Sequence, residues 1–226
     1  MGNILTVASG KGGVSKTATV MILAVNLAER GYRVAVVDAD RNQSFASWHA
    51  QAYEGPVFTC RSEIDHIKVV DLAGELAESH DVVLVDTAGF ENLTAASAIG
   101  MADYVIIPCM ADRGSVRETM RTAQQVASLS KAARRTIPYS LLCTRWKPRG
   151  LSERAALDSL REERLPILDN VFGDLSDFSK LSFSGTVPTA GKAGAQAASL
   201  ISELVGKGAI PSRPVRPGSR KEGRAA

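Results

Sequence analysis

The chain has 226 residues, of which 45% are hydrophobic, 23% charged and 5% aromatic. This length and hydrophobic fraction suit one α/β domain with a sizeable core, and they exclude a wholly disordered or collagen-like protein. The three cysteines, Cys60, Cys109 and Cys143, are too scattered for a disulfide framework or a metal site, so we expect a reducing, cytoplasmic compartment.

Charge is distributed unevenly along the chain, whose formal net charge is +3. Residues 209–226 hold five basic residues and one acidic residue, which leaves a net charge of −1 on the rest. Within that remainder, residues 119–152 contain seven basic side chains and no acidic one. Residues 208–226 also contain three prolines and show no apolar periodicity, so we expect a single domain over residues 1–207 followed by a disordered basic tail.

Apolar, β-branched runs alternate with helical patterns along the chain. We expect strands at residues 4–8, 33–38, 57–60, 82–86, 104–109, 137–143 and 167–172. We expect helices at residues 16–30, 42–52, 64–79, 93–101 and 115–130, with two more before residue 206. Because the strands are continuous apolar runs, both faces of each are expected to be buried. The alternation predicts an α/β fold with a doubly wound, mostly parallel sheet flanked by helices.

A glycine-rich loop joins the first predicted strand to the first predicted helix. It reads Gly10, Lys11, Gly12, Gly13, Val14, Ser15, Lys16 and Thr17. Its glycines allow consecutive backbone N–H groups to surround phosphate oxygens, and the helix N-terminus adds a partial positive charge. We therefore predict that residues 10–18, ending at Ala18, bind nucleotide phosphates. Lys16 then reaches the β- and γ-phosphates, and the Thr17 hydroxyl is a ligand of Mg²⁺.

Acidic residues follow two of the apolar strands. Asp38 and Asp40 end the second predicted strand, and Asp86 ends a later one, three residues before Gly89. Ligands of doubly wound sheets bind at the carboxyl ends of strands, so we expect these residues to lie near the loop. Asp38 either contributes to that site or only forms hydrogen bonds with the loop that follows it.

Together with Lys11, a second lysine inside the loop, these motifs resemble the ParA/MinD family of deviant Walker P-loop ATPases. The closer resemblance is to the small ParA partition ATPases, and it extends from the first strand to about residue 206. It implies that Lys11 crosses a dimer interface to the partner's phosphates and acts in catalysis with Lys16 and Asp40. It also implies that Asp40 orients the attacking water, that Thr17, Asp40 and Asp86 surround Mg²⁺, and that the Gly89 N–H senses the γ-phosphate.

The chain departs from the family's pattern at three places. Ser15 replaces the last glycine of the loop, and it costs on the order of 1 kcal/mol if the backbone there needs a positive φ. Ala18 replaces a second threonine, so a phosphate contact is either lost or moved to Thr19. Arg41 and Asn42 stand where the family usually has Pro-Gln.

The nucleotide and the DNA contacts are inferred from the second half of the chain. The stretch 144–147 lacks the aspartate with which guanine-specific relatives read their base, so we expect ATP. Either Arg145 or Trp146 stacks on adenine, or Trp146 is a packed residue of the surface. The basic residues in 119–152 either form a solvated face or bind duplex DNA through its phosphates. The DNA candidates are Arg121, Arg134, Arg135, Arg145, Lys147 and Arg149.

The function these features favour is that of an Mg²⁺-dependent partition ATPase that hydrolyses ATP slowly without its partner. ATP closes a homodimer that binds DNA non-specifically on the nucleoid, and a cargo-bound, ParB-like or other adaptor protein stimulates hydrolysis, so that plasmid or chromosome DNA is positioned. The end of the chain has few large apolar residues, so we expect no membrane attachment. The alternatives are a nucleotide-gated positioning scaffold for a non-DNA cargo with weak ATPase activity, and a metabolic enzyme that phosphorylates a small carboxylate.

Overall fold

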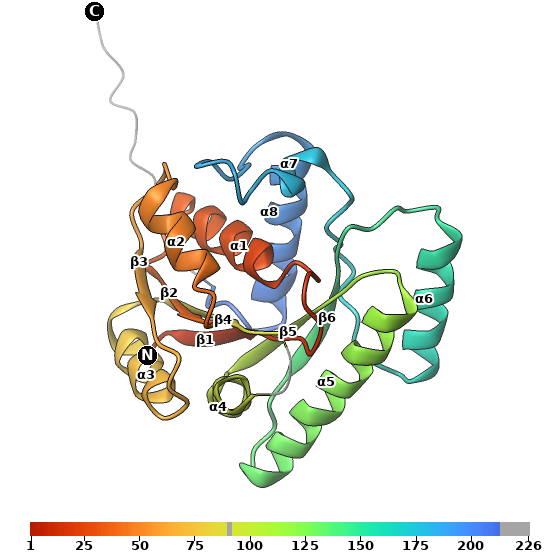
Figure 1. Ribbon diagram of the computed structural model, residues 1–226, viewed down its shortest axis with the longest axis horizontal. Coiled ribbons are helices and arrows are strands. Elements are labelled where there is room, and N and C mark those ends of the chain that lie inside the picture. The colour runs from red at the N-terminus through yellow and green to blue at the C-terminus, as the bar shows by residue number, and fades with distance from the viewer. Residues whose placement is uncertain (90–91, 213–226) are drawn as a thin grey trace, which may run out of the picture.

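The computed structural model describes residues 1–89 and 92–212. Its centre is one sheet of six parallel strands, with helices on both faces (Figure 1). The strands are β1 (Asn3–Val7), β2 (Val34–Ala39), β3 (Thr59–Ser62), β4 (Val82–Thr87), β5 (Tyr104–Cys109) and β6 (Tyr139–Cys143). Their order across the sheet is β3-β2-β4-β1-β5-β6. The expected doubly wound α/β fold is confirmed.

Two helical layers cover the sheet because its strands are apolar on both faces. The helices are α1 (Lys16–Glu29), α2 (Ser44–Gln51), α3 (Lys68–Ser79), α4 (Leu93–Met101), α5 (Arg113–Ala132), α6 (Leu151–Glu162), α7 (Ser176–Ser179) and α8 (Gly191–Gly206). α1, α2 and α8 pack on one face, where Leu23 and Leu200 are fully buried. α3, α4 and α5 pack on the other face, and α6 lies beside α5. β3 begins two residues later than expected, after an exposed Val57.

The strand expected at residues 167–172 does not form. Isolated bridges at Ile167 and Gly173, with a few backbone hydrogen bonds, join this segment to β6 and the residues that follow it. Between the two bridges, the backbone N–H groups of Asp169 and Asn170 do not pair with β6. They donate to the Glu203 carboxylate of α8, at 2.9 Å and 3.0 Å. The segment therefore follows β6 without a continuous ladder, because a side-chain acceptor replaces the strand at its centre.

The packed part of the chain reaches past residue 207, where we expected the domain to end. Ala209 and Ile210 are buried against the α1 side of the core. The Asn3 side-chain amide donates to the carbonyls of Gly208 and Ala209, both at 3.0 Å. The expected tail from residue 213 onward lies outside the described residues.

Candidate functional site

The glycine-rich loop connects β1 to α1 at the carboxyl edge of the sheet, as expected. Gly13 and Ser15 both have positive φ, at 76° and 73°. This geometry suits Gly13, whereas Ser15 carries a side chain in the left-handed region. Ser15 is the N-cap of α1, yet its side chain accepts no capping hydrogen bond. The first N–H groups of α1 thus have no side-chain cap from Ser15, and such groups are anion ligands at a helix N-terminus.

Lys16 and Asp86 are buried ionisable residues beside the loop. The Lys16 ammonium donates to the Lys11 carbonyl at 3.2 Å. Burial lowers the pKa of Lys16, while Asp86 and Asp40 act in the opposite direction. Burial raises the pKa of Asp86 to about 7, although the nearby Thr17 hydroxyl and Lys16 lower it in part.

The Asp86 carboxylate is the clearest indication of a cation-binding position. The side chain is 1% exposed, and neither oxygen has a hydrogen-bond partner within ordinary geometric limits among the described residues. An unpartnered buried carboxylate costs free energy, so native structures supply it with a donor, a water or a cation. With the Thr17 hydroxyl beside it, this oxygen donor set fits Mg²⁺, which prefers oxygen ligands and retains water.

Asp38 holds the loop that carries Asp40. One Asp38 oxygen accepts from the Asp40 N–H at 3.1 Å, and the other accepts from the Ala46 N–H at 2.9 Å. Asp38 was expected either to contribute to the site or to form hydrogen bonds with the following loop. The structure shows the hydrogen bonds with the loop. The Asp40 carboxylate accepts from the Asn42 N–H at 2.9 Å and lies on the wall of the cleft.

Gly89 contacts the glycine-rich loop from the end of β4. A Cβ atom at this position would lie 3.2 Å from the Gly12 nitrogen, which is closer than ordinary packing allows. A side chain at this position would require the loop to shift by a few tenths of an ångström. The backbone of Gly89 therefore lies directly against the backbone of the glycine-rich loop.

The loop with Lys16 and Thr17, together with Asp40 and Gly89, lines a cleft of about 820 Å³, a volume typical of small-ligand sites. Thr144 and Arg145, at the end of β6, form part of its far wall. The rest of this wall was missed by the sequence analysis and includes Phe172, Gly173, Asp174, Leu175 and Phe178. No motif marks these residues, because they reach the cleft by following the β6 edge from a distant part of the chain.

Trp146 and Thr19, which were considered as nucleotide ligands, have structural roles. Trp146 is buried among the residues of the α5 side of the core, so it packs rather than stacks on a base. The Thr19 hydroxyl is buried and donates to the Ser15 carbonyl at 2.8 Å. Ala18 lines the cleft without a polar group, so no hydroxyl from residues 18–19 reaches the cleft.

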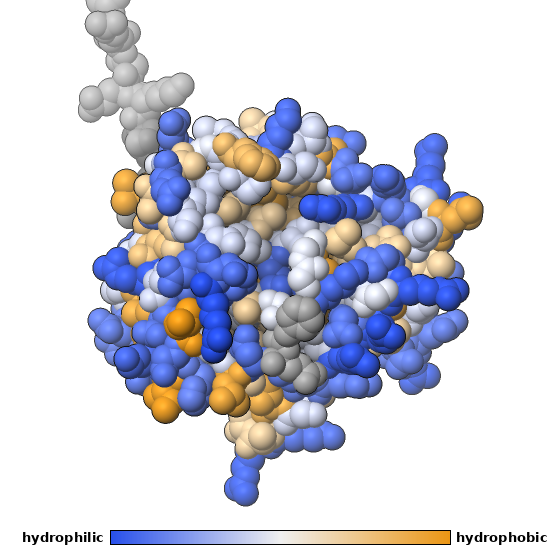
Figure 2. Space-filling model, in the orientation of Figure 1, coloured by the Kyte–Doolittle hydropathy of each residue, from blue (hydrophilic) through white to orange (hydrophobic). Residues whose placement is uncertain are grey.

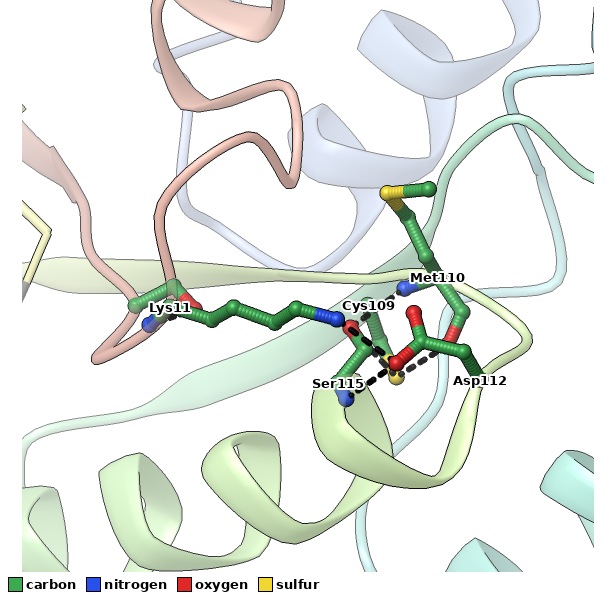
Figure 3. Close-up of polar contacts among 6 residues, drawn as sticks. Lys11, Cys109, Met110, Asp112 and Ser115 are labelled. Carbon is green, nitrogen blue, oxygen red and sulfur yellow. Dashed lines mark hydrogen bonds and ion pairs between the residues drawn. The ribbon is translucent and has the colours of Figure 1, made fainter.

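Lys11 extends from the loop toward the N-terminus of α5 (Figure 3). Its ammonium lies 2.6 Å from the Asp112 carboxylate, which also caps α5 by accepting from the Ser115 N–H at 2.9 Å. The Ser115 hydroxyl in turn accepts from the Met110 N–H at 2.8 Å. In this monomer Lys11 is thus bound within its own chain.

The predicted DNA residues lie in different environments. Arg121 pairs with Glu118 at 2.8 Å, and Lys147 lies 3.4 Å from Asp174. Arg135 donates to two carbonyls at the end of α4, at 2.7 Å and 2.9 Å. Arg134 and Arg149 are exposed, and Arg145 lines the cleft. The stretch that is free of acids in sequence is therefore bordered by acids in space.

Among the helices that the structure describes, none has both the length and the apolar character needed to cross a membrane.

The sequence is similar to that of VirC1 and ParA proteins. A family model described as VirC1 protein matches residues 2–203. Protein virC1 of Rhizobium radiobacter is 29% identical over 187 residues, covering 80% of this chain and 81% of that protein. Protein ParA of the same organism is 30% identical over 146 residues, covering 64% and 65% of the two chains.

Solved structures share the fold at lower identity. The ATP complex of a substituted Cyanothece McdA has a TM-score of 0.77 at 17% identity, covering 95% of this chain and 99% of that one. MinD of Pyrococcus horikoshii with Mg-ADP has a TM-score of 0.68 at 20% identity, covering 92% and 98%.

Proposed function

The chain belongs to the VirC1 family, which is related to the ParA and MinD P-loop ATPases, and from this premise we propose that it is an ATP-dependent DNA partition protein. In this proposal ATP and Mg²⁺ bind in the cleft and close a homodimer. The dimer binds nucleoid DNA without sequence preference, and a ParB-like or other adaptor stimulates hydrolysis. The ATPase domain covers residues 1–207 with the packed residues that follow, and a basic tail supplements the DNA contacts.

The observation that carries the proposal is the buried, unpartnered Asp86 carboxylate beside Lys16. When bound, Mg²⁺ supplies charge neutralisation at the β- and γ-phosphates. The chain supplies the rest. Residues 10–18 bind and orient the phosphates, Lys16 stabilises negative charge, and the Asp38 hydrogen bonds hold Asp40 where it can position water.

Variants of Lys16 and Lys11 test nucleotide binding and dimerisation separately. Lys16 is buried in the cleft, whereas Lys11 extends out of it toward α5. We expect Lys16→Ala to abolish ATP binding and hydrolysis. Lys11→Ala should keep binding by the monomer but lose the ATP-dependent dimer and its turnover. Calorimetry with Mg-ATP and light scattering measure the two steps, with exposed Lys68→Ala as the matched control. Normal turnover in Lys16→Ala would refute the assignment.

A second candidate is a nucleotide-gated scaffold that hydrolyses little. It is favoured by the strained Ser15 and by the Thr19 hydroxyl, which is bound to the Ser15 carbonyl rather than free for a phosphate. Tight ATP binding with slow single-turnover hydrolysis, even with DNA and adaptor present, would support this candidate over the partition ATPase.

A further inference from the structure

One face of α5 carries a continuous stripe of exposed basic and neutral polar side chains. We call this stripe the α5 ridge, and its members are Arg113, Arg117, Arg121, Gln124, Ser128 and Lys131. The spacing of four, four, three, four and three residues keeps these positions on one side of a helix. The sequence analysis missed Arg113 and Arg117, because the acid-free stretch in the chain begins only after Glu118.

Glu118 is the one acidic residue within α5, and it does not lie on the ridge. It is half-buried and turned toward the glycine-rich loop, since a Cβ at Gly10 would lie 2.8 Å from its carboxylate. Its ion pair with Arg121 is therefore made at the flank of the ridge. Among the described residues, Arg113 and Arg117 form no ion pair. The ridge is thus a positive surface that this part of the chain does not neutralise.

The chemistry of the ridge fits the phosphates of a nucleic acid duplex. A helix of 20 residues is about 30 Å long, which matches about nine base pairs at ~3.4 Å each. Arginine presents several donors in a fixed plane and suits phosphate oxygens. The ridge contains no aromatic residue on which single-stranded bases could stack. It also lacks the buried aromatic and aliphatic anchors typical of protein interfaces, which argues against an acidic protein.

Hydrophilic side chains dominate the surface over α5 and α6, at the lower right of the view (Figure 2). α6 carries the exposed Arg154 and Arg161, but also Asp158 and Glu162 on its exposed positions. Charges of both signs therefore alternate on α6, whereas the α5 ridge has only one sign. This difference places the strongest phosphate-binding surface on α5 rather than on its neighbour.

We propose that the α5 ridge is the surface through which this protein contacts duplex DNA. The inference rests on the proposed function, which includes DNA as a partner. Of the residues expected from the sequence it keeps Arg121 on α5, and it moves the main contact from the candidates at residues 134–149 to this helix face. Because the other side of α5 holds Lys11 through Asp112 and the Gly10 N–H through Thr122 at 3.1 Å, the DNA surface and the nucleotide loop share one rigid element.

The test is the salt dependence of DNA binding by the full chain with Mg²⁺ and a non-hydrolysable ATP analogue. The variant is Arg113→Gln/Arg117→Gln/Arg121→Gln, and fluorescence anisotropy follows a labelled 30-base-pair duplex of arbitrary sequence. We expect weaker binding and a slope of log affinity against log salt reduced by about 0.9 per lost phosphate contact, or about 2.7 in total. The double variant Arg113→Gln/Arg117→Gln leaves the Arg121–Glu118 pair intact and should lose about 1.8.

The matched control is Arg61→Gln/Lys68→Gln/Lys192→Gln, which removes the same charge from exposed sites away from α5 and should keep the wild-type slope. If wild type binds DNA and the ridge variants keep its slope, the ridge assignment is wrong and the proposed function stands. If wild type binds no duplex, both fail. If the ridge variants lose binding to poly-L-glutamate but not to DNA, the occupant is an acidic protein and the inference is overturned.

Discussion

Ser15 occupies a backbone conformation that usually belongs to glycine, with φ of 73° and ψ of 30°. Left-handed geometry costs a residue with a Cβ about 1–2 kcal/mol, whereas glycine costs about 0.5–1 kcal/mol in chain entropy. We therefore expect Ser15→Gly to raise the free energy of unfolding by up to about 1 kcal/mol. Urea unfolding measures this change, and Ser15→Ala, which keeps the strain, should bring no gain. Equal gains from both variants would show that the hydroxyl, not the backbone, is unfavourable.

Asp86 makes the stability of the ligand-free protein depend on pH. Its pKa is about 7 when folded and about 3.9 in an unfolded chain. Between these values the folded protein holds a proton that the unfolded chain has released. The free energy of unfolding therefore falls as pH rises through this range, and the effect levels off above pH 7.

Asp86→Asn should remove this slope. In EDTA we expect the variant to be more stable than wild type at pH 8 and to differ least near pH 4, while Mg-ATP no longer stabilises it. Urea unfolding from pH 4 to pH 8 provides the measurement. Asp71→Asn, at an exposed position on α3, should keep the wild-type pH profile. A variant that parallels wild type across this range would show that Asp86 is already ionised in the fold.

At the scale of elements, the sequence analysis correctly predicted the strands and helices that a local residue pattern determines. Continuous apolar runs such as residues 82–86 fix buried strands wherever they occur, and all six strands of the sheet were anticipated. The segment at residues 167–172 has the same composition, yet its conformation depends on Glu203, which lies more than 30 residues away. No local pattern shows that a carboxylate from α8 will take the N–H groups of a strand.

Glu203 should therefore stabilise both α8 and the wall of the cleft. Burial by itself raises the pKa of Glu203, but donors from Asp169 and Asn170 outweigh it and lower the pKa. Because hydrogen bonds to a charged group contribute about 1.5–3 kcal/mol, Glu203→Ala should destabilise the fold by about that amount or more. It should also weaken ATP binding through displaced residues 172–175. Lys207→Ala, which removes only a 3.9 Å ion pair, is the control for both measurements. If Glu203→Ala leaves the ATP affinity unchanged, residues 172–175 do not contribute to ATP binding.

At the scale of the whole molecule, parallel topology explains which site residues could be predicted. It brings the ends of β1, β2 and β4 to one edge, so the loop, Asp40 and Asp86 could be placed together from strand positions alone. The acidic neighbours of the basic residues could not all be predicted from strand positions. Residues 119–152 contain no acid, but the fold brings the distant Asp174 beside Lys147, whereas Glu118 is a helical neighbour of Arg121. The far wall of the cleft was unpredictable for the same reason, since its residues approach only in three dimensions.

Dimer formation should compete with the contact between Lys11 and Asp112. Lys11 cannot reach a partner's phosphates while it is bound at 2.6 Å within its own chain, and this partly exposed pair contributes at most about 1 kcal/mol. Asp112→Asn keeps an oxygen to cap α5 but removes the charge, so ATP-dependent dimers should form with up to about fivefold higher affinity. Sedimentation equilibrium with a non-hydrolysable ATP analogue measures the dimer constant. Lys11→Ala/Asp112→Asn should show no such gain, because the lysine that is released is absent. An unchanged constant in Asp112→Asn would mean that Lys11 leaves Asp112 at no cost, or that it does not leave at all.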